Sequence, residues 1–348
     1  MKEKDIRDIG MVKEYLDQES KWISQFVGKD GLIMPEYVRK VACPCCGKNK
    51  GKKVFIRNSF MLEECRNCLT MYVNPRFTRE MLNKYYRAKE SRGKYFEILS
   101  CGRSQEIRLK NIFKPRCDYI EKRIKGRLEN KCRISLLDIG CASGQFLSVL
   151  DPKKWSQLNG VEASKDLAMR AQKEIPYAKI INSSFEECVF DPESFDVITL
   201  WEVLEHVFDP VQFLKSIGKI LKKNGLLFLS TPNVEGFEIQ ILLDKGLSVY
   251  PPSHLNYFRK TTISHLFKRG GLIVEEIGTP GKLDVDIVCN FINEHPNEHP
   301  VIKQRLGLFW YEILKDNSEM GETIRKKLQE LISDCGLSSH MMITCYKR

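Results

Sequence analysis

Short apolar runs alternate with helical segments along the second half of the chain, and this alternation restricts the fold more than any other feature of the sequence. The apolar runs cover residues 134–139, 158–161, 178–181, 195–200 and 225–230, with later strands expected at 272–277 and 340–346. Strands that alternate with helices in this way form a mostly parallel sheet with helices on both faces. We therefore predict an α/β fold with a doubly wound, mostly parallel sheet.

The length and composition fit a globular protein with more than one domain. The chain has 348 residues, of which 42% are apolar and 29% are charged, and domains commonly contain about 100–200 residues. The sequence has neither an apolar run of the ~20 residues that cross a bilayer nor a secretory start. We expect a soluble, cytoplasmic protein that does not contact membranes.

Changes in residue composition and apolar pattern along the sequence predict four segments. Residues 1–40 are expected to form a helical extension, and residues 41–77 a four-cysteine module. Residues 78–133 are expected to form a helical linker or cap. The α/β domain is expected over residues 134–348, with a helical insertion at about 280–335.

Four of the thirteen cysteines form two Cys-x-x-Cys pairs, at Cys43 and Cys46 and, after 18 further residues, at Cys65 and Cys68. This spacing is typical of a zinc ribbon. Two such turns complete a tetrahedron of thiolates, and a closed four-cysteine site leaves no position for a substrate, so we expect the Zn²⁺ to be structural. Cys45 is an extra thiol that could compete as a ligand, and a redox pair or surface thiols are the alternative.

The net charge of +11 is unevenly distributed. Residues 1–133 contain 32 Lys/Arg and 17 Asp/Glu, a balance of +15, whereas residues 134–348 contain 24 and 28, a balance of −4. The excess is either a solvated surface or an attraction for an anionic partner, nucleotide-linked or nucleic acid.

A glycine loop follows the first predicted strand of the α/β domain. Asp138 ends the strand, and Gly140 and Gly144 lead into a helix, so the backbone can approach a ligand at the carboxyl edge of the sheet. Glu162 ends the next strand, where an acid can accept the ribose hydroxyls of an adenosine. Cys141 stands between the glycines and the third glycine of a dinucleotide site is missing, which favours an adenosine without a pyrophosphate.

The segment Asp138-Ile-Gly140-Cys141-x-x-Gly144 resembles the first motif of class I S-adenosylmethionine-dependent methyltransferases, which have a Rossmann-like fold. Residues 195–210 resemble the fourth strand of that family and the segment after it, and residues 225–233 resemble the fifth strand. The likeness covers roughly residues 134–278. The whole chain looks like the branch with an N-terminal zinc module, which is often linked with modification of sugars and other small molecules.

The resemblance implies S-adenosyl-L-methionine as the cofactor and nine positions that would bind it, namely Asp138, Gly140, Cys141, Gly144, Glu162, Ser184, Phe185, Trp201 and Glu202. Asp138 and the glycines would face the methionine moiety and Glu162 the ribose. Ser184 and Phe185 would flank the adenine, and Trp201 with Glu202 would close over the cofactor. Ser184 stands where many relatives have an Asp, which leaves that one contact open.

Two histidines are candidates for a catalytic base, which methyl transfer needs when the nucleophile carries a proton of high pKa. His206 follows the fourth strand, and His254 lies in a later loop that should reach the same edge of the sheet. The second loop resembles one in sugar C-methyltransferases that carries Tyr-x-Glu-His, but Ser253 replaces the Glu here. O-methylation is therefore at least as consistent as C-methylation, and either histidine could instead be a structural anchor.

The sequence thus predicts methylation of a small, anionic acceptor such as a nucleotide-linked sugar or saccharide precursor. One alternative is an RNA or protein methyltransferase that docks through the zinc ribbon. Another is a binding module that keeps a vestigial cofactor fold. The sequence does not indicate an oligomeric state.

Overall fold

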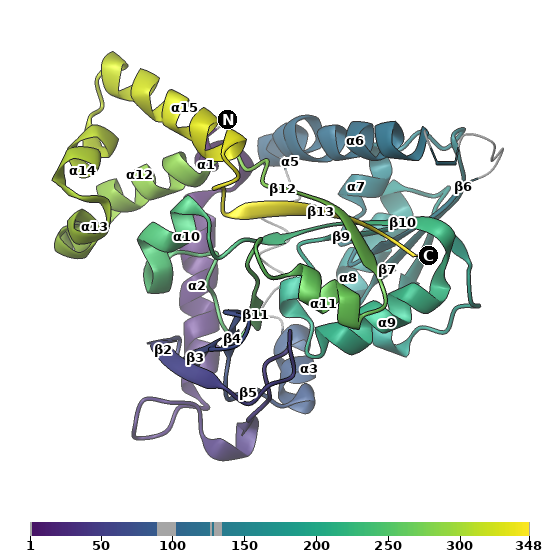
Figure 1. Cartoon of the computed structure of the whole chain (residues 1–348), viewed down its shortest axis with the longest axis horizontal. Coiled ribbons are helices and arrows are strands. Elements are labelled where there is room, and N and C mark those ends of the chain that lie inside the picture. The colour runs from purple at the N-terminus through teal and green to yellow at the C-terminus, as the bar shows by residue number, and fades with distance from the viewer. Residues whose placement is uncertain (1, 89–101, 126, 129–133, 348) are drawn as a thin grey trace.

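The computed structural model describes residues 2–88, 102–125, 127–128 and 134–347, and its centre is a seven-stranded sheet (Figure 1). The strand order is β12-β13-β10-β9-β6-β7-β8. The bounds are β6 Ile134–Ile139, β7 Trp155–Glu162, β8 Lys179–Asn182, β9 Phe195–Trp201, β10 Leu221–Pro232, β12 Ile273–Gly278 and β13 His340–Tyr346. The predicted α/β class is confirmed, and every predicted strand of this sheet is present.

The strand order reverses at β6. The chain runs from β6 to β7 and β8 on one side, and then returns to place β9 and β10 on the other side. Neighbours from β8 to β10 are parallel, whereas β13 is antiparallel to both β10 and β12. Ligands of open α/β sheets bind beyond the carboxyl ends of the strands at such a reversal, so the edge beyond β6, β7 and β9 is the place to look for a site.

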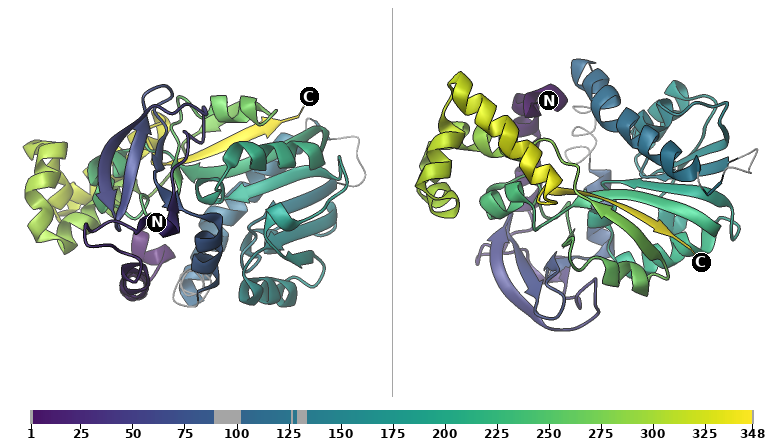
Figure 2. Two further views of the ribbon diagram at one scale, coloured as in Figure 1. Left: turned by 90° about the horizontal axis from the view of Figure 1, so that it is seen from below. Right: turned by 45° about the horizontal axis from the view of Figure 1, so that its top comes forward.

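Successive side chains of the buried strands point to opposite faces of the sheet, as the period of two requires. Leu136 packs into one apolar cluster with α6 (Lys114–Lys125) and α7 (Gln145–Ser148). Leu137 packs into another cluster with α9 (Pro210–Ile220) and α11 (Ser264–Arg269). Both faces are therefore covered, with α8 (Lys165–Glu174) lying against β7 and β8 (Figure 2).

The cysteine segment forms a second, four-stranded sheet. Its strands are β2 (Gly51–Arg57), β3 (Phe60–Cys65) and β4 (Met71–Val73), and the fourth strand is the distant β11 (Asn256–Tyr257). β1 (Val38–Arg39) pairs with β5 (Arg76–Phe77), and the helices around them are α1 (Glu3–Ile6), α2 (Ile9–Ser24) and α3 (Arg79–Arg87). The cysteine segment is thus joined to the α/β part by hydrogen-bonded backbone.

The helix before β6 has an irregular middle. It consists of α5 (Gly102–Arg108), a π-helical turn over Leu109–Phe113, and α6. Pro115 has no backbone N–H to donate to the preceding turn, which favours a widened turn just ahead of it. The irregular turn therefore lies on the N-terminal side of Pro115.

Four helices lie between β12 and β13: α12 (Asp284–Glu294), α13 (His299–Leu306), α14 (Leu308–Lys315) and α15 (Glu319–Asp334). They share an apolar cluster with α10 (Phe237–Leu242) at the end of the molecule opposite the C-terminus (Figure 1). Among the described residues, no helix combines the length and the apolar character needed to cross a bilayer.

Candidate active site

The glycine loop lies at the carboxyl end of β6. Gly140 and Gly144 have φ of +74° and +80°, which side-chain-bearing residues rarely adopt. A Cβ on Gly144 would lie 2.3 Å from Cδ1 of Ile175, and one on Gly140 would lie 2.7 Å from Cγ2 of Val203. Both glycines are required by the backbone and by close packing of the loop against its neighbours.

Glu162 ends β7 directly beside this loop. Its carboxylate accepts hydrogen bonds from the backbone N–H of Ala142 (3.0 Å) and of Ser164 (2.8 Å). Asn182 at the end of β8 donates to the carbonyl oxygen of Glu162 at 3.0 Å. The acid is therefore held at the carboxyl edge between β6 and β7. The glycine loop together with Glu162 is called the cofactor edge below.

Asp138 and Cys141 lie beneath the loop. Asp138 is 2% exposed and accepts a hydrogen bond from Thr199 Oγ1 at 2.6 Å, which links β6 to β9. Burial raises the pKa of Asp138 to about 7, although the Thr199 hydrogen bond and Arg116 oppose this. The Cys141 side chain packs toward Gly160, where an added Cβ would lie 2.7 Å from its sulfur. Both side chains support the loop, and Cys141 offers a ligand only its backbone.

The residues predicted around the adenine follow β8. Ser184 precedes a 3₁₀ turn over Phe185–Glu187. The Phe185 ring is 7% exposed and lies edge-on to Phe213 at 5.0 Å between ring centroids. Phe185 is thus part of the apolar cluster on that face of the sheet.

Trp201 is the last residue of β9, and the side chain of Arg116 lies over its ring. The guanidinium of Arg116 lies 4.5 Å from the Trp201 ring, and Phe146 packs against the same ring. The indole Nε1 is buried and has no hydrogen-bond partner among the described residues. A buried donor of this kind normally finds a partner, so Trp201 has unused hydrogen-bonding capacity at this edge.

Glu202 belongs to a charge cluster that the sequence did not reveal, made of Arg116, Glu202 and His340. The Glu202 carboxylate lies 3.0 Å from Nε2 of His340 and 3.7 Å from the guanidinium of Arg116. Burial by itself raises the pKa of Glu202, but His340 and Arg116 outweigh it and lower the pKa to about 2. Arg116 lies on α6, Glu202 directly follows β9 and His340 begins β13, so no local sequence signal could have joined them.

The two candidate histidines are brought together although 48 positions separate them. The ring centroids of His206 and His254 lie 4.7 Å apart. Nδ1 of His206 lies 2.7 Å from the carbonyl oxygen of Ser253, and Nδ1 of His254 lies 2.9 Å from that of Ser248. A neutral ring in either place carries its proton on Nδ1 and its lone pair on Nε2, as a general base requires.

Glu205 completes this histidine cluster and was missed from the sequence. Its fully buried carboxylate lies 3.6 Å from Nε2 of His206 and accepts a hydrogen bond from Thr231 at 2.9 Å. Donor atoms of Glu205, His206 and His254 lie within 4.8 Å of one another, close enough for one cation to contact all three. The sequence signal that could have indicated Glu205 is its position directly before His206.

The four predicted zinc ligands also converge. The sulfurs of Cys43, Cys46, Cys65 and Cys68 lie within 4.8 Å of one another, and two pairs are 3.5 Å apart. A disulfide would bring sulfurs to about 2.05 Å, whereas a zinc tetrahedron separates them by about 3.8 Å. Cys45 is buried but its sulfur is not one of these four. The donor set and spacing fit Zn²⁺.

Residues 111–277 match a protein family described as "Methyltransferase domain". This part of the chain is similar to methyltransferase domains. The match begins ahead of β6 and so includes α6 with Arg116. The matched residues therefore include the cofactor edge, the histidine cluster, and Arg116 and Glu202 of the charge cluster, whereas His340 lies beyond them.

Curated relatives are similar to part of this chain. The ubiquinone biosynthesis O-methyltransferase of Histophilus somni (strain 2336) is 36% identical over 34% of this chain and 51% of its own length. The protein of the same name from Xanthomonas campestris pv. campestris (strain B100) is 28% identical over 45% of this chain and 73% of its own length. This chain thus spans about half the length of the first of these relatives.

Among solved structures, the plantazolicin methyltransferase BpumL in complex with SAH is similar to this chain, with 14% sequence identity and a TM-score of 0.47. The alignment covers 77% of this chain and 94% of that one.

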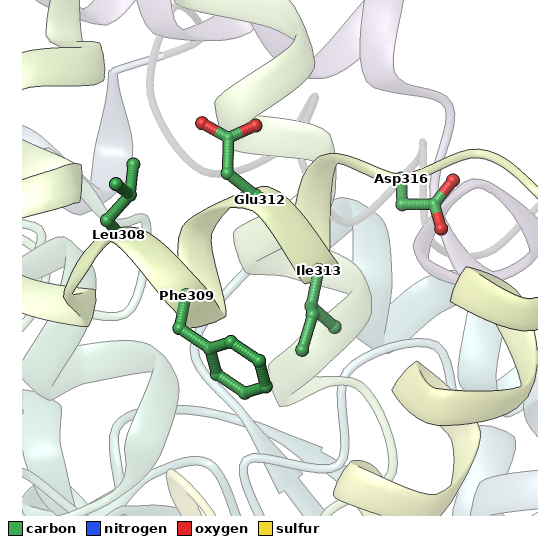
Figure 3. Close-up of a pocket in the computed structure, with 5 residues that line it drawn as sticks. All are labelled: Leu308, Phe309, Glu312, Ile313 and Asp316. Carbon is green, nitrogen blue, oxygen red and sulfur yellow. The ribbon is translucent and has the colours of Figure 1, made fainter.

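An open hollow of about 680 Å³ lies away from these residues, on the helices between β12 and β13. Figure 3 shows its lining along and just after α14, by Leu308, Phe309, Glu312, Ile313 and Asp316. None of the predicted site residues belongs to it.

Proposed function

We propose that this chain is an S-adenosylmethionine-dependent methyltransferase that acts on a small molecule. The observation that carries the proposal is Glu162, which is held beside the glycine loop at the carboxyl edge where the strand order reverses. An anchored acid next to a glycine loop matches the hydrogen-bonding needs of a ribose without a pyrophosphate. The cofactor supplies an electrophilic methyl group when bound.

Within this proposal the cofactor edge binds and orients the cofactor. Glu162 accepts the ribose hydroxyls, the backbone of Gly140, Cys141 and Gly144 lies along the methionine moiety, and Asp138 supports the loop from below. Ser184 and Phe185 flank the adenine. Trp201 can donate its buried Nε1 proton, and Glu202 closes that side through the charge cluster.

We infer that the histidine cluster handles the acceptor. His254, with His206 as the second candidate, would accept the proton of an acceptor hydroxyl at Nε2. The bound cofactor would supply the methyl group, and its sulfur–methyl bond would break to leave S-adenosylhomocysteine. Because the carbonyl oxygens of Ser248 and Ser253 hold the Nδ1 atoms, the rings keep that orientation. Glu205 then stabilises the imidazolium at His206.

An oxygen acceptor is supported by the relatives, which are named O-methyltransferases. We further propose an anionic acceptor such as a nucleotide-linked sugar or saccharide precursor, because the basic excess lies in residues 1–133. The cysteine module, defined as residues 41–77, would hold one structural Zn²⁺.

Calorimetric titration with S-adenosylhomocysteine tests the cofactor site. Wild type should bind in the micromolar range, and Glu162→Gln should bind about 10–100-fold more weakly, since a hydrogen bond to a charged group contributes roughly 1.5–3 kcal/mol. Glu174→Gln is the matched control, because this acid is exposed on α8. Absence of binding by the folded wild type would leave only the vestigial binding module.

The acceptor class is tested separately by mass spectrometry. The protein is incubated with S-adenosylmethionine and either phenols, nucleoside diphosphate sugars or RNA, and methylated products are sought. Methylation of a small hydroxyl compound supports the proposal. Methylation of RNA alone, with an affinity that falls steeply with salt, would replace it with docking through the cysteine module.

A further inference from the structure

The segment that carries His254 is anchored in the cysteine module. Two residues after His254 the chain forms β11, and β11 pairs antiparallel with β4, placing Asn256 opposite Tyr72 and Tyr257 opposite Met71. β4 also pairs with β3, which ends at Cys65, and Cys68 lies in the turn between the two strands. A continuous hydrogen-bonded path therefore runs from the second cysteine pair to the histidine loop.

Arg76, just after β4, lies where this module meets both histidine segments. Its guanidinium is fully buried. Nη1 donates to the carbonyl oxygen of Phe208 at 3.1 Å, two residues after His206, and Nη2 donates to that of Leu255 at 3.3 Å, the residue after His254. One planar group thus bridges the two segments, which lie 132 and 179 positions further along the chain.

Asn256 closes the same junction from the other side. It is fully buried, accepts a hydrogen bond from Arg76 Nη2 at 3.2 Å, and donates to the carbonyl oxygen of Val207 at 2.7 Å. The backbone N–H of Leu255 donates to the carbonyl oxygen of Glu205 at 2.8 Å. The backbone on either side of His206 and His254 is therefore cross-linked through one buried polar network.

The hydrogen-bond partners of Arg76 carry no negative charge, so a contribution to stability alone does not account for this buried guanidinium. Besides Phe208 and Leu255 they are the carbonyl of Val73 and the side-chain oxygen of Asn256, all four neutral oxygens. Burial lowers the pKa of Arg76 to about 10, so the group remains charged at neutral pH. A buried charge satisfied by neutral oxygens contributes little net stability, but its rigid fork fixes the acceptors it binds.

We propose that Arg76 is a positioning residue, through which the cysteine module sets the relative placement of His206 and His254. The inference rests on the proposed function of that pair. In its absence the two segments would still fold, but the rings would lose their common orientation. A misplacement of about 1 Å at such a site can cost about 100-fold in rate.

Arg259 provides a matched control. It also ties the cysteine module to the chain beyond β11, because it donates to the carboxylate of Glu64 at 2.6 Å and to the carbonyl oxygen of Leu69 at 2.7 Å. Its described contacts do not reach the segments around His206 or His254. If Arg76 only docks the module, Arg76→Met and Arg259→Met should behave alike.

The test uses the full chain, labelled with ¹⁵N at histidine ring nitrogens. The chain has six histidines, and His206→Gln and His254→Gln assign the two signals. Arg76→Met and Arg76→Lys should shift or broaden both signals and change their tautomer pattern, because Lys keeps the charge but not the fork. Arg259→Met should leave them unchanged, and all variants should keep their zinc and bind S-adenosylhomocysteine within about threefold of wild type.

Unchanged histidine signals in a folded Arg76 variant would overturn the proposal. If Arg76→Met does not fold, Arg76→Lys and Asn256→Ala decide the question, and loss of folding in all three would show a general stability element instead. Failure of the proposed function is separately visible, because it would appear as absent cofactor binding in wild type.

Discussion

The cofactor edge and the histidine cluster are built differently. The cofactor edge consists of a loop and an acid within 23 consecutive residues, 140–162, on adjacent strands. The histidine cluster joins two segments that are 48 positions apart and held by the cysteine module. A site formed by one short segment should tolerate substitutions elsewhere in the chain. A site formed by distant segments should lose its geometry when any contact that holds those segments together is removed.

Removal of zinc should give the largest effect and separate the two regions. Structural zinc contributes roughly 10–16 kcal/mol of apparent binding free energy in small zinc modules, so a chelator or Cys65→Ser should disorder β3 and β4 and release β11. Ring signals of His206 and His254 should change, while S-adenosylhomocysteine affinity should change less than about tenfold. Metal analysis and calorimetry measure this.

Cys335→Ser is the control for that experiment, since this cysteine is exposed and outside the module. If zinc removal weakened cofactor binding as much as it changed the ring signals of His206 and His254, the two regions would not differ in their dependence on the cysteine module. A folded wild type without zinc, insensitive to chelators, would remove the zinc proposal.

Asp138 should make the cofactor edge sensitive to pH. Its pKa is raised by burial to about 7 from 3.8, so between these values the native state binds the proton more tightly than the unfolded chain. Its contribution to stability is present below pH 3.8 and lost as pH rises through about 7. The unfolding free energy of wild type relative to Asp138→Asn should therefore fall by up to about 4 kcal/mol over this range.

Denaturant melts between pH 4 and 8 measure that difference. Thr199→Val, which removes the hydrogen-bond donor to Asp138, should raise the pKa of Asp138 further and extend the slope upward. A difference between wild type and Asp138→Asn that does not vary with pH would contradict the prediction.

Gly144→Ala should damage the cofactor edge alone. The added methyl group meets a positive φ and the side chain of Ile175, and we expect a loss of about 2–4 kcal/mol in unfolding free energy. Cofactor affinity should fall while the histidine signals persist. Gly278→Ala is the control, because nothing lies within 4 Å of its Cβ position; an equal effect there would show that the loss is not specific to the loop.

Glu202→Gln should have the smallest effect on stability. The Glu202 side chain is 41% exposed, so solvent screens its pairs with His340 and Arg116, and despite the lowered pKa they should contribute only about 0–1 kcal/mol. Glu193→Gln, which breaks the exposed pair with Lys347, should be similar in thermal melts. A loss above about 3 kcal/mol at Glu202 alone would mean that the charge cluster also supports the fold, and would weaken the contrast between the two regions.

Much of the fold could be predicted because its signals are local. The strand at 134–139 was found from an apolar run that is buried on both faces, and the strand at 340–346 in the same way. Thr78 precedes α3, and its hydroxyl accepts the N–H of Met81 as an N-cap, a position that threonine favours. The pairing of β11 with the cysteine module could not be predicted, because two residues carry no strand period.

What the sequence by itself determined is the chemistry that depends on spacing along the chain. Glycine at positions 140 and 144 permits the positive φ that the loop adopts. The two-residue spacing of each Cys-x-x-Cys pair places its two sulfurs close together, and the alternation of apolar runs with helical segments defines the strands. The tertiary structure alone decided that His206 meets His254 beside Glu205, that Arg116 meets Glu202 and His340, and that Arg76 clamps the histidine segments. These contacts join residues up to 224 positions apart, and only the packing of distant elements determines which side chains meet across such a separation.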